Sequence, residues 1–262
     1  MSSYRLNTAK ERIASGKPIT ILVVTMPSVP AAQIWARSGI DVLIFDMEHG
    51  VIDMTALHAM IAATTGTGCI PMVRVPWNMH WIVKTVLDAG ALGIMFPLCA
   101  TAPEVESAVR SMYYPPKGER GWGPFMTQYR WGLPQDRYVE IANNELLNFI
   151  QIERPEAVSN LDEIVKVPGV DMFVVSRHDL TTSMGHVASP TRELHPDVAP
   201  MIARMEDTIR RSGVPMAGLA RDADHARRAL ENGYQGLILG FDWMLLERGA
   251  QVAHDIRRQL IE

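Results

Sequence analysis

The sequence predicts a single (β/α)8 barrel, and three observations support this fold class. Eight short apolar runs of strand type alternate with helical segments, which is typical of a parallel sheet, and eight such strands favour a closed sheet. The chain has 262 residues, close to the roughly 250 residues usual for this barrel. The turn after the first strand contains no glycine, whereas an open nucleotide-binding sheet needs a glycine-rich turn there. We therefore expect one domain over residues 1–262.

The expected elements are apolar runs and helical repeats separated by turn residues. The strands cover residues 19–24, 41–46, 70–75, 93–97, 146–152, 170–175, 213–219 and 236–240. The helices, recognised by apolar residues at helical spacing, cover residues 28–39, 55–65, 80–89, 101–112, 155–165, 198–212 and 223–231. Ser28 begins the first helix, Gly39 and Gly90 end two of them, and Pro103 lies in a first turn, where proline is tolerated.

Two segments interrupt the alternation. Residues 113–144 are predicted to be irregular, because glycines and prolines flank Arg120 and Trp122 within a few positions. The aromatic residues of this segment favour an ordered loop, and a loop of this length in a compact domain is usually functional or disordered. Residues 185–196, rich in Ser, Pro and Thr, form a second expected loop.

Composition excludes some classes of function. The net charge of −4 and the absence of a basic run argue against nucleic-acid binding, which needs a positively charged surface. Residues 1–17 are polar and no run of eighteen apolar residues occurs, so we expect a cytoplasmic protein that does not contact membranes. Cys69 and Cys99 form no metal motif and are expected as small buried side chains rather than a disulfide.

Polar residues gather at the carboxyl ends of the expected strands, where (β/α)8 barrels carry their chemistry. One such residue is more often a satisfied structural group, but several at one barrel mouth favour a ligand or metal, because burying unpaired polarity is costly. The residues at this rim are Asp46, Glu48, His49, Arg74, Gln151, Glu153, Ser176, Arg177, His178 and Asp179.

Three of these residues suggest metal and enolate chemistry. Glu153 and Asp179 follow neighbouring strands, and their carboxylates are suited to a hard divalent cation such as magnesium or manganese. The open positions of such a cation would take water or a chelating 2-oxo acid. Arg74 offers a planar fork to a carboxylate or an enolate oxygen.

A second group of rim residues is suited to proton transfer. His49 titrates near neutrality and can take or give a proton, with Asp46 or Glu48 able to orient it. Asp88 lies at a helix end, so from the residues alone it is structural or at a subunit contact.

Six segments together resemble, in order, the motifs of the HpcH/HpaI aldolases. The resemblance runs from about residue 20 to residue 250, and it is specific only when the motifs are taken together. The segments are Phe45–Gly50, Val73–Pro76, Leu87–Pro97, Pro115–Gly123, Gln151–Glu153 and Gly169–Gly185.

The resemblance implies a class II, metal-dependent pyruvate aldolase on a barrel of the phosphoenolpyruvate-binding type. Such an enzyme cleaves 4-hydroxy-2-oxo acids into pyruvate, or a similar 2-oxo acid, and an aldehyde, with magnesium, manganese or cobalt as its divalent ion. The family is usually hexameric, with the C-terminal helix exchanged between neighbouring subunits.

The resemblance also implies roles for the residues of the site. Glu153 and Asp179 look like the metal ligands, Arg74 like the residue that polarises the pyruvate carbonyl, and Gln151 like the site glutamine of the family. It also implies that His49, supported by Asp46, acts as the acid and base. Asp88 matches a position that reaches into the site of an adjacent subunit, and Arg120 lies on the loop that closes near the aldehyde.

One departure from the family pattern precedes Asp179. The family usually has a small, neutral run there, whose backbone amides receive the pyruvate carboxylate, but this chain has Ser176, Arg177 and His178. If the backbone path is kept, Arg177 adds a cation near the metal, and His178 adds a further ligand or proton donor. If it is not kept, pyruvate is in doubt as the substrate; alternatively, both side chains point away from the site.

Three classes of function therefore stay open. The first is a lyase that breaks or forms a bond to a pyruvate-like enolate. The second is an enzyme that condenses or decarboxylates a larger oxo acid on the same scaffold, as macrophomate synthase and the siderophore citrate synthases do. The third is a non-catalytic 2-oxo acid binder in which the changed loop has disabled the chemistry.

Overall fold

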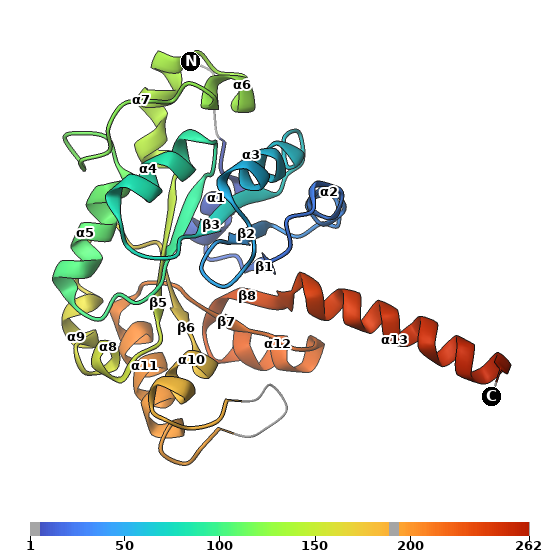
Figure 1. Cartoon of the computed structure of the whole chain (residues 1–262). Coiled ribbons are helices and arrows are strands. Elements are labelled where there is room, and N and C mark those ends of the chain that lie inside the picture. Colours follow the sequence, from blue (N-terminus) through green and yellow to red (C-terminus); the bar gives the residue numbers. More distant parts are fainter. Residues whose placement is uncertain (1–5, 189–193, 262) are drawn as a thin grey trace.

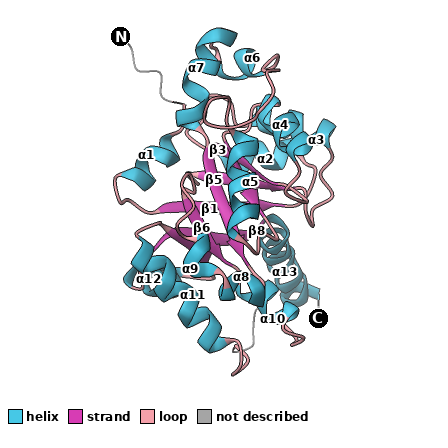
Figure 2. Cartoon of the chain, turned by 90° about the vertical axis from the view of Figure 1, so that its left-hand side faces the viewer, coloured by secondary structure: helices cyan, strands magenta, loops and turns pink. Residues whose placement is uncertain are grey.

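The computed structural model describes residues 6–188 and 194–261 and contains a closed barrel of eight parallel strands, ordered β1 to β8 around the ring (Figures 1 and 2). Each strand pairs with the next, and β8 pairs with β1. The predicted (β/α)8 fold is confirmed. The strands are β1 (Ile19–Val24), β2 (Val42–Asp46), β3 (Ile70–Arg74), β4 (Gly93–Phe96), β5 (Leu147–Ile152), β6 (Met172–Val175), β7 (Met216–Leu219) and β8 (Tyr234–Phe241).

Helices surround the barrel and follow its strands (Figure 2). They are α1 (Thr8–Ala14), α2 (Val29–Ala36), α3 (Met54–Ala63), α4 (His80–Asp88), α5 (Ala102–Met112), α6 (Thr127–Trp131), α7 (Gln135–Glu145), α8 (Pro155–Ser159), α9 (Leu161–Ile164), α10 (Arg177–Ser183), α11 (Ala199–Ser212), α12 (Ala223–Glu231) and α13 (Asp242–Ile261). Among these described helices none is long and apolar enough to cross a membrane.

Alternation along the strands separates two buried layers. In β2, Leu43 and Phe45 pack with the surrounding helices, whereas Val42 and Ile44 belong to the cluster that fills the barrel. Asp46 continues the inward series at the carboxyl end of β2. Arg74 is its register partner on β3 and continues the inward series of that strand. The same period of two that builds the core therefore points these polar side chains into the mouth.

Helix α1 closes the opposite end of the barrel. Ala9 and Ile13 are buried and belong to the cluster inside the barrel. Asn7 accepts the amide of Lys10 at the helix start and donates through its side chain to the carbonyl of Leu92. Helix α1 lies within residues 1–17, which are polar in sequence. The helix could not be recognised there because only one short face of it is apolar.

The prediction that residues 113–144 are irregular is wrong for α6 and for α7, which lies within this segment except for its last residue, Glu145. Helix α7 buries Tyr138 and Ala142 against Tyr114, and its other face is polar. The apolar residues of α7 all lie between Tyr138 and Ala142, a stretch too short to reveal a helical period in sequence. The expected helix over residues 155–165 is divided into α8 and α9 at Asn160, whose side chain donates to the Ala100 carbonyl.

Helix α13 extends away from the barrel (Figure 1). Its side chains are largely exposed, including the apolar Val252, Ile256 and Leu260, which are spaced four residues apart along one side. The barrel itself leaves this apolar stripe uncovered. Cys69 and Cys99 are both buried and free, as the sequence predicts.

Candidate active site

Arg74 is fixed at the centre of the mouth by a buried ion pair. Its Nε and Nη2 donate to the two carboxylate oxygens of Asp46 at 2.8 and 2.6 Å. Its Nη1 lies 3.2 Å from Glu48 Oε2 and 3.5 Å from Gln151 Oε1. Because the guanidinium stays protonated and two of its nitrogens are held, the third directs a cationic N–H toward the neighbouring polar side chains.

Three carboxylates lie close together beside this cation. The pKa of Glu153 is raised to about 7, mainly by burial and to a lesser extent by the charges of Asp179 and Glu48, against the lowering effect of the hydrogen bond from the Leu98 amide. Burial also raises the pKa of Glu48 to about 7, although the charge of Arg74 opposes the shift. Glu48 and Glu153 therefore resist ionisation, and a bound cation would favour their charged forms.

Glu153 is oriented by the backbone of the neighbouring strand end. The amide of Leu98, just after β4, donates to Glu153 Oε1 at 2.6 Å, and the Gln151 side chain donates to the other oxygen. Leu98 has a φ of 60°, which is unusual for a residue with a side chain. A costly backbone conformation that positions a buried carboxylate is a common feature of functional sites.

The donor set fits a hard divalent cation. Glu48, Glu153 and Asp179 supply oxygen ligands, which magnesium and manganese prefer. In the described part of the chain, Glu48 Oε2 is buried without a hydrogen-bond donor in good geometry, even though Arg74 is near. Sequence reasoning placed Glu48 beside His49 and not beside the expected ligands Glu153 and Asp179.

His49 is placed differently from what the resemblance implies. Its ring is two-thirds exposed, and Nε2 lies 3.6 Å from Glu48 Oε1. Asp46 contacts the backbone amide of His49, not its ring, because the carboxylate is already engaged by Arg74. Glu48 is therefore the carboxylate positioned to orient the imidazole.

Asp88 and Arg120 pair with each other outside the cavity that contains Arg74. Arg120 Nη2 lies 2.6 Å from Asp88 Oδ1, and its buried guanidinium is 4.4 Å from the ring centre of Tyr114. Within one subunit this pair fixes the segment after α5 to the end of α4.

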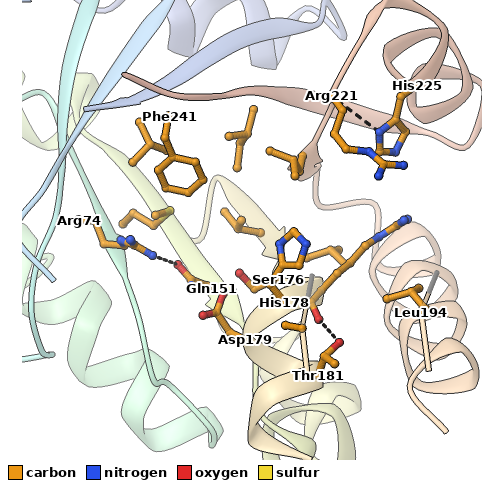
Figure 3. Close-up of a pocket in the computed structure, with 18 of the residues that line it drawn as sticks. Arg74, Gln151, Ser176, His178, Asp179, Thr181, Leu194, Arg221, His225 and Phe241 are labelled. Carbon is orange, nitrogen blue, oxygen red and sulfur yellow. Dashed lines mark hydrogen bonds between the residues drawn. The ribbon is translucent and has the colours of Figure 1, made fainter. Parts of the chain in front are cut away.

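Ser176, Arg177 and His178 all line a cavity of about 230 Å³ at the barrel mouth. Figure 3 labels Ser176 and His178 in this cavity. Arg74, Gln151 and Asp179 line it too. The alternative that Arg177 and His178 point away from the site therefore does not describe this structure. The guanidinium of Arg177 nevertheless pairs with Glu206 of α11 at 3.0 Å.

The sequence matches the family described as HpcH/HpaI aldolase/citrate lyase over residues 22–248. The chain belongs to this family. It is 32% identical to the hydroxypyruvate/pyruvate aldolase of Roseovarius nubinhibens, covering 94% of each chain. It is 33% identical to the 4-hydroxy-2-oxo-heptane-1,7-dioate aldolase of Klebsiella pneumoniae, covering 94% of this chain and 91% of that one. These relatives are aldolases, and the prediction that this HpcH/HpaI member is a carbon–carbon lyase is confirmed.

Solved structures show the same barrel. An HpcH/HpaI family protein of Burkholderia cenocepacia has a TM-score of 0.87 at 31% identity and covers 96% of this chain and 100% of its own. The citrate synthase SbnG has a TM-score of 0.85 at 27% identity, with 97% and 98% covered. Macrophomate synthase has a TM-score of 0.83 at 26% identity, with 100% and 94% covered.

A second polar group in this HpcH/HpaI protein was not predicted. His186, His195 and Asp197 each offer one ligand atom, and these atoms lie within 4.8 Å of one another. The two imidazole rings are stacked with centres 3.6 Å apart, and the group is largely exposed. His186 and His195 lie within residues 185–196, which are predicted only as a loop, so no spacing in the sequence indicates that they meet.

Proposed function

We propose that this protein catalyses metal-dependent aldol cleavage and condensation of 4-hydroxy-2-oxo acids, with pyruvate or a similar 2-oxo acid and an aldehyde as the other reactants. The observation that carries this proposal is the convergence of Glu48, Glu153 and Asp179 with the fixed cation of Arg74. The names of the curated relatives support the same reaction class.

Glu153 and Asp179 would hold a divalent ion, magnesium, manganese or cobalt, with Glu48 beside it. When bound, this ion supplies positive charge to the carboxylate and the 2-oxo oxygen of the substrate. Arg74 directs its third nitrogen toward the same space and stabilises negative charge on the enolate oxygen as the C3–C4 bond breaks. Because Asp46 holds the other two nitrogens, little reorganisation is needed when charge develops.

His49 and Glu48 would carry the proton. Cleavage requires removal of the proton from the 4-hydroxyl group, and condensation requires its return. The exposed His49 ring can exchange protons with water, and Glu48 Oε1 lies 3.6 Å from its Nε2.

Proton exchange into pyruvate is the direct test. The protein is stripped by a chelator and resupplied with magnesium, and the pyruvate methyl signal is followed by proton NMR in deuterated water. We expect magnesium-dependent loss of the signal, and no loss with Glu153→Gln. Magnesium is the first ion to use, because His186, His195 and Asp197 offer nitrogen ligands that favour zinc, nickel or cobalt.

A condensing enzyme is the second candidate function. The similarity to citrate synthase SbnG and macrophomate synthase favours it, as does the arginine that this chain places two residues before Asp179. A protein that forms the enolate but cleaves no 4-hydroxy-2-oxo acid would support this second function. Lack of exchange with any metal or 2-oxo acid would contradict both enzymatic proposals and favour the non-catalytic binder.

We also propose a homo-oligomer, hexameric as in the family, in which α13 is exchanged between neighbouring subunits. The apolar stripe of Val252, Ile256 and Leu260 supports this arrangement, because contiguous exposed apolar surface usually marks an interaction site.

A further inference from the structure

The cavity at the barrel mouth has two ends of different chemistry. Figure 3 shows Arg74, Gln151 and Asp179 toward one end, and Arg221 and His225 at the other. The volume of about 230 Å³ is below the roughly 300–1,000 Å³ of most ligand pockets, so it suits one small molecule. Both ends belong to one continuous cavity.

The far end is cationic. Arg177 of α10, Arg221 after β7 and His225 of α12 line it. Among the described residues that line the whole cavity, Asp179 is the one acidic side chain, and it belongs to the end proposed to hold the metal. The chemistry proposed for that end makes no use of the cations at the far end.

Arg177 is held in place before any ligand arrives. Its Nη2 contacts Glu206 Oε1 at 3.0 Å, and the hydroxyl of Tyr234 donates to the same oxygen at 2.7 Å. A guanidinium has five N–H donors, so this contact leaves others for the cavity that Arg177 also lines. Fixing a flexible cation in advance lowers the entropic cost of binding an anion.

His225 is arranged as a donor among these arginines. Its Nδ1 accepts the backbone amide of Arg221 at 3.3 Å, so the proton of the neutral ring is on Nε2. Burial lowers its pKa, and the positive charges of Arg177, Arg221 and Arg228 lower it further, against an opposing effect of Asp222. Arg228 is therefore near this group as well, and it lines the adjoining cavity with Arg177. An anion placed here would meet the guanidinium groups of Arg177 and Arg221 and an N–H donor of His225.

We infer that Arg177, Arg221 and His225 form a subsite for a second anionic group, a carboxylate or a phosphonate, on the 2-oxo acid. This inference rests on the proposed function for one point, that the 2-oxo acid end of the substrate lies beside Asp179. The 2-oxo acid of this enzyme is then one that carries an acidic tail, and pyruvate fills only the metal end of the cavity.

Matched pairs of ligands test the subsite. Binding is measured by calorimetry with magnesium-loaded protein, using 2-oxoglutarate against 2-oxopentanoate and 3-phosphonopyruvate against 2-oxobutanoate. Within each pair the acidic tail is the main difference, and the two pairs distinguish carboxylate from phosphonate recognition. Oxalate, which can fill only the metal end, reports on that end separately.

We expect at least one acidic ligand to bind about tenfold more tightly than its partner, the factor contributed by one charge-assisted hydrogen bond. Arg221→Gln should bring that ratio close to one while oxalate affinity stays within about twofold. Arg227→Gln is the matched control, because Arg227 lies nearby on α12, is exposed, pairs with Asp224 and is not among the residues lining the cavity. Thermal melts establish that each variant is folded.

Ratios near one for both pairs in the unmodified protein would overturn the subsite, whether or not oxalate binds. Loss of magnesium-dependent oxalate binding alone would count against the proposed function instead.

A second measurement uses the unmodified protein for ligand binding. The His225 imidazole is titrated by NMR, and the His225→Gln variant serves only to assign its signal. Bound 3-phosphonopyruvate should raise its pKa, and an unchanged pKa in the presence of bound ligand would contradict the assignment.

Discussion

At the residue scale, the sequence identifies the polar residues of the mouth but not their partners. Asp46, Arg74 and Glu153 follow from their positions at strand ends. The pairing of Asp46 with Arg74 instead of the His49 ring depends on strand register, which adjacent sequence does not reveal. Arg177 shows the same limit, because its partner Glu206 is on α11, a separate element.

Arg74→Lys tests whether the fixed fork matters as well as its charge. Lysine keeps one positive charge but cannot make the two parallel contacts with Asp46, so the cation is no longer held in place. We expect the rate of proton exchange to fall by about a hundredfold, and Arg74→Ala to raise the barrier by about 3 kcal/mol. Magnesium affinity, measured by calorimetry, should be retained in both variants. Exchange at the unmodified rate in Arg74→Ala would mean that the enolate is stabilised elsewhere.

The raised pKa values of Glu48 and Glu153 make metal binding dependent on pH. Both carboxyls titrate near pH 7 in the metal-free protein, so below that pH magnesium must displace protons. We expect the apparent magnesium affinity to be nearly constant above about pH 8 and to fall by up to about tenfold per pH unit per carboxyl below pH 7. Calorimetry at pH 6, 7 and 8 measures this dependence. An affinity equal at pH 6 and 8 would contradict it.

In the metal-free protein the same raised pKa values make the free energy of unfolding fall as the pH rises, whereas metal affinity rises with pH. A carboxyl whose folded pKa is about 7, above its ordinary 4.5, binds more protons in the folded state than in the unfolded state between these values. The free energy of unfolding of the metal-free protein should therefore decrease as the pH rises from 4.5 to 7. Magnesium should stabilise the protein more at pH 8 than at pH 5.5, as measured by thermal melts. Glu153→Gln, which cannot ionise, is the control in which this difference becomes smaller.

At the element scale, the apolar strands are well predicted because burial on both faces leaves little choice of residue. The strand bounds shift by only a few residues; residues 213–219, for example, shorten to Met216–Leu219. Helices α6 and α7 could not be predicted in the same way, since α7 packs through Tyr138 and Ala142 against Tyr114, a contact that the local pattern does not reveal. Leu98 is a further example. Its left-handed backbone serves Glu153, which is 55 residues away along the chain.

At the scale of the whole molecule, counting strands and helices predicts the parallel sheet, because parallel strands must be connected by helices that cover it. The number of strands, the chain length and the glycine-free first turn then favour a closed barrel over an open sheet. No comparable rule predicts from the sequence which surfaces contact another subunit. Helix α13 illustrates this, since its residues are neither apolar enough for a core nor polar enough for a fully solvated surface. Most of its positions are polar, but one side has the apolar stripe of Val252, Ile256 and Leu260, which no part of the described barrel covers.

The proposed exchange of α13 leads to a test by charge substitution. Val252→Lys combined with Ile256→Lys places two charges in the stripe, and burying them in an interface without partners is costly. We expect the variant to sediment as a smaller species than the unmodified protein in analytical ultracentrifugation, with the barrel still folded by circular dichroism. Gln251→Lys adds one charge on another side of the same helix and should leave the size unchanged. If the double variant keeps the full assembly, α13 does not form the contact, and a protein that is already monomeric at micromolar concentration would contradict the exchange itself.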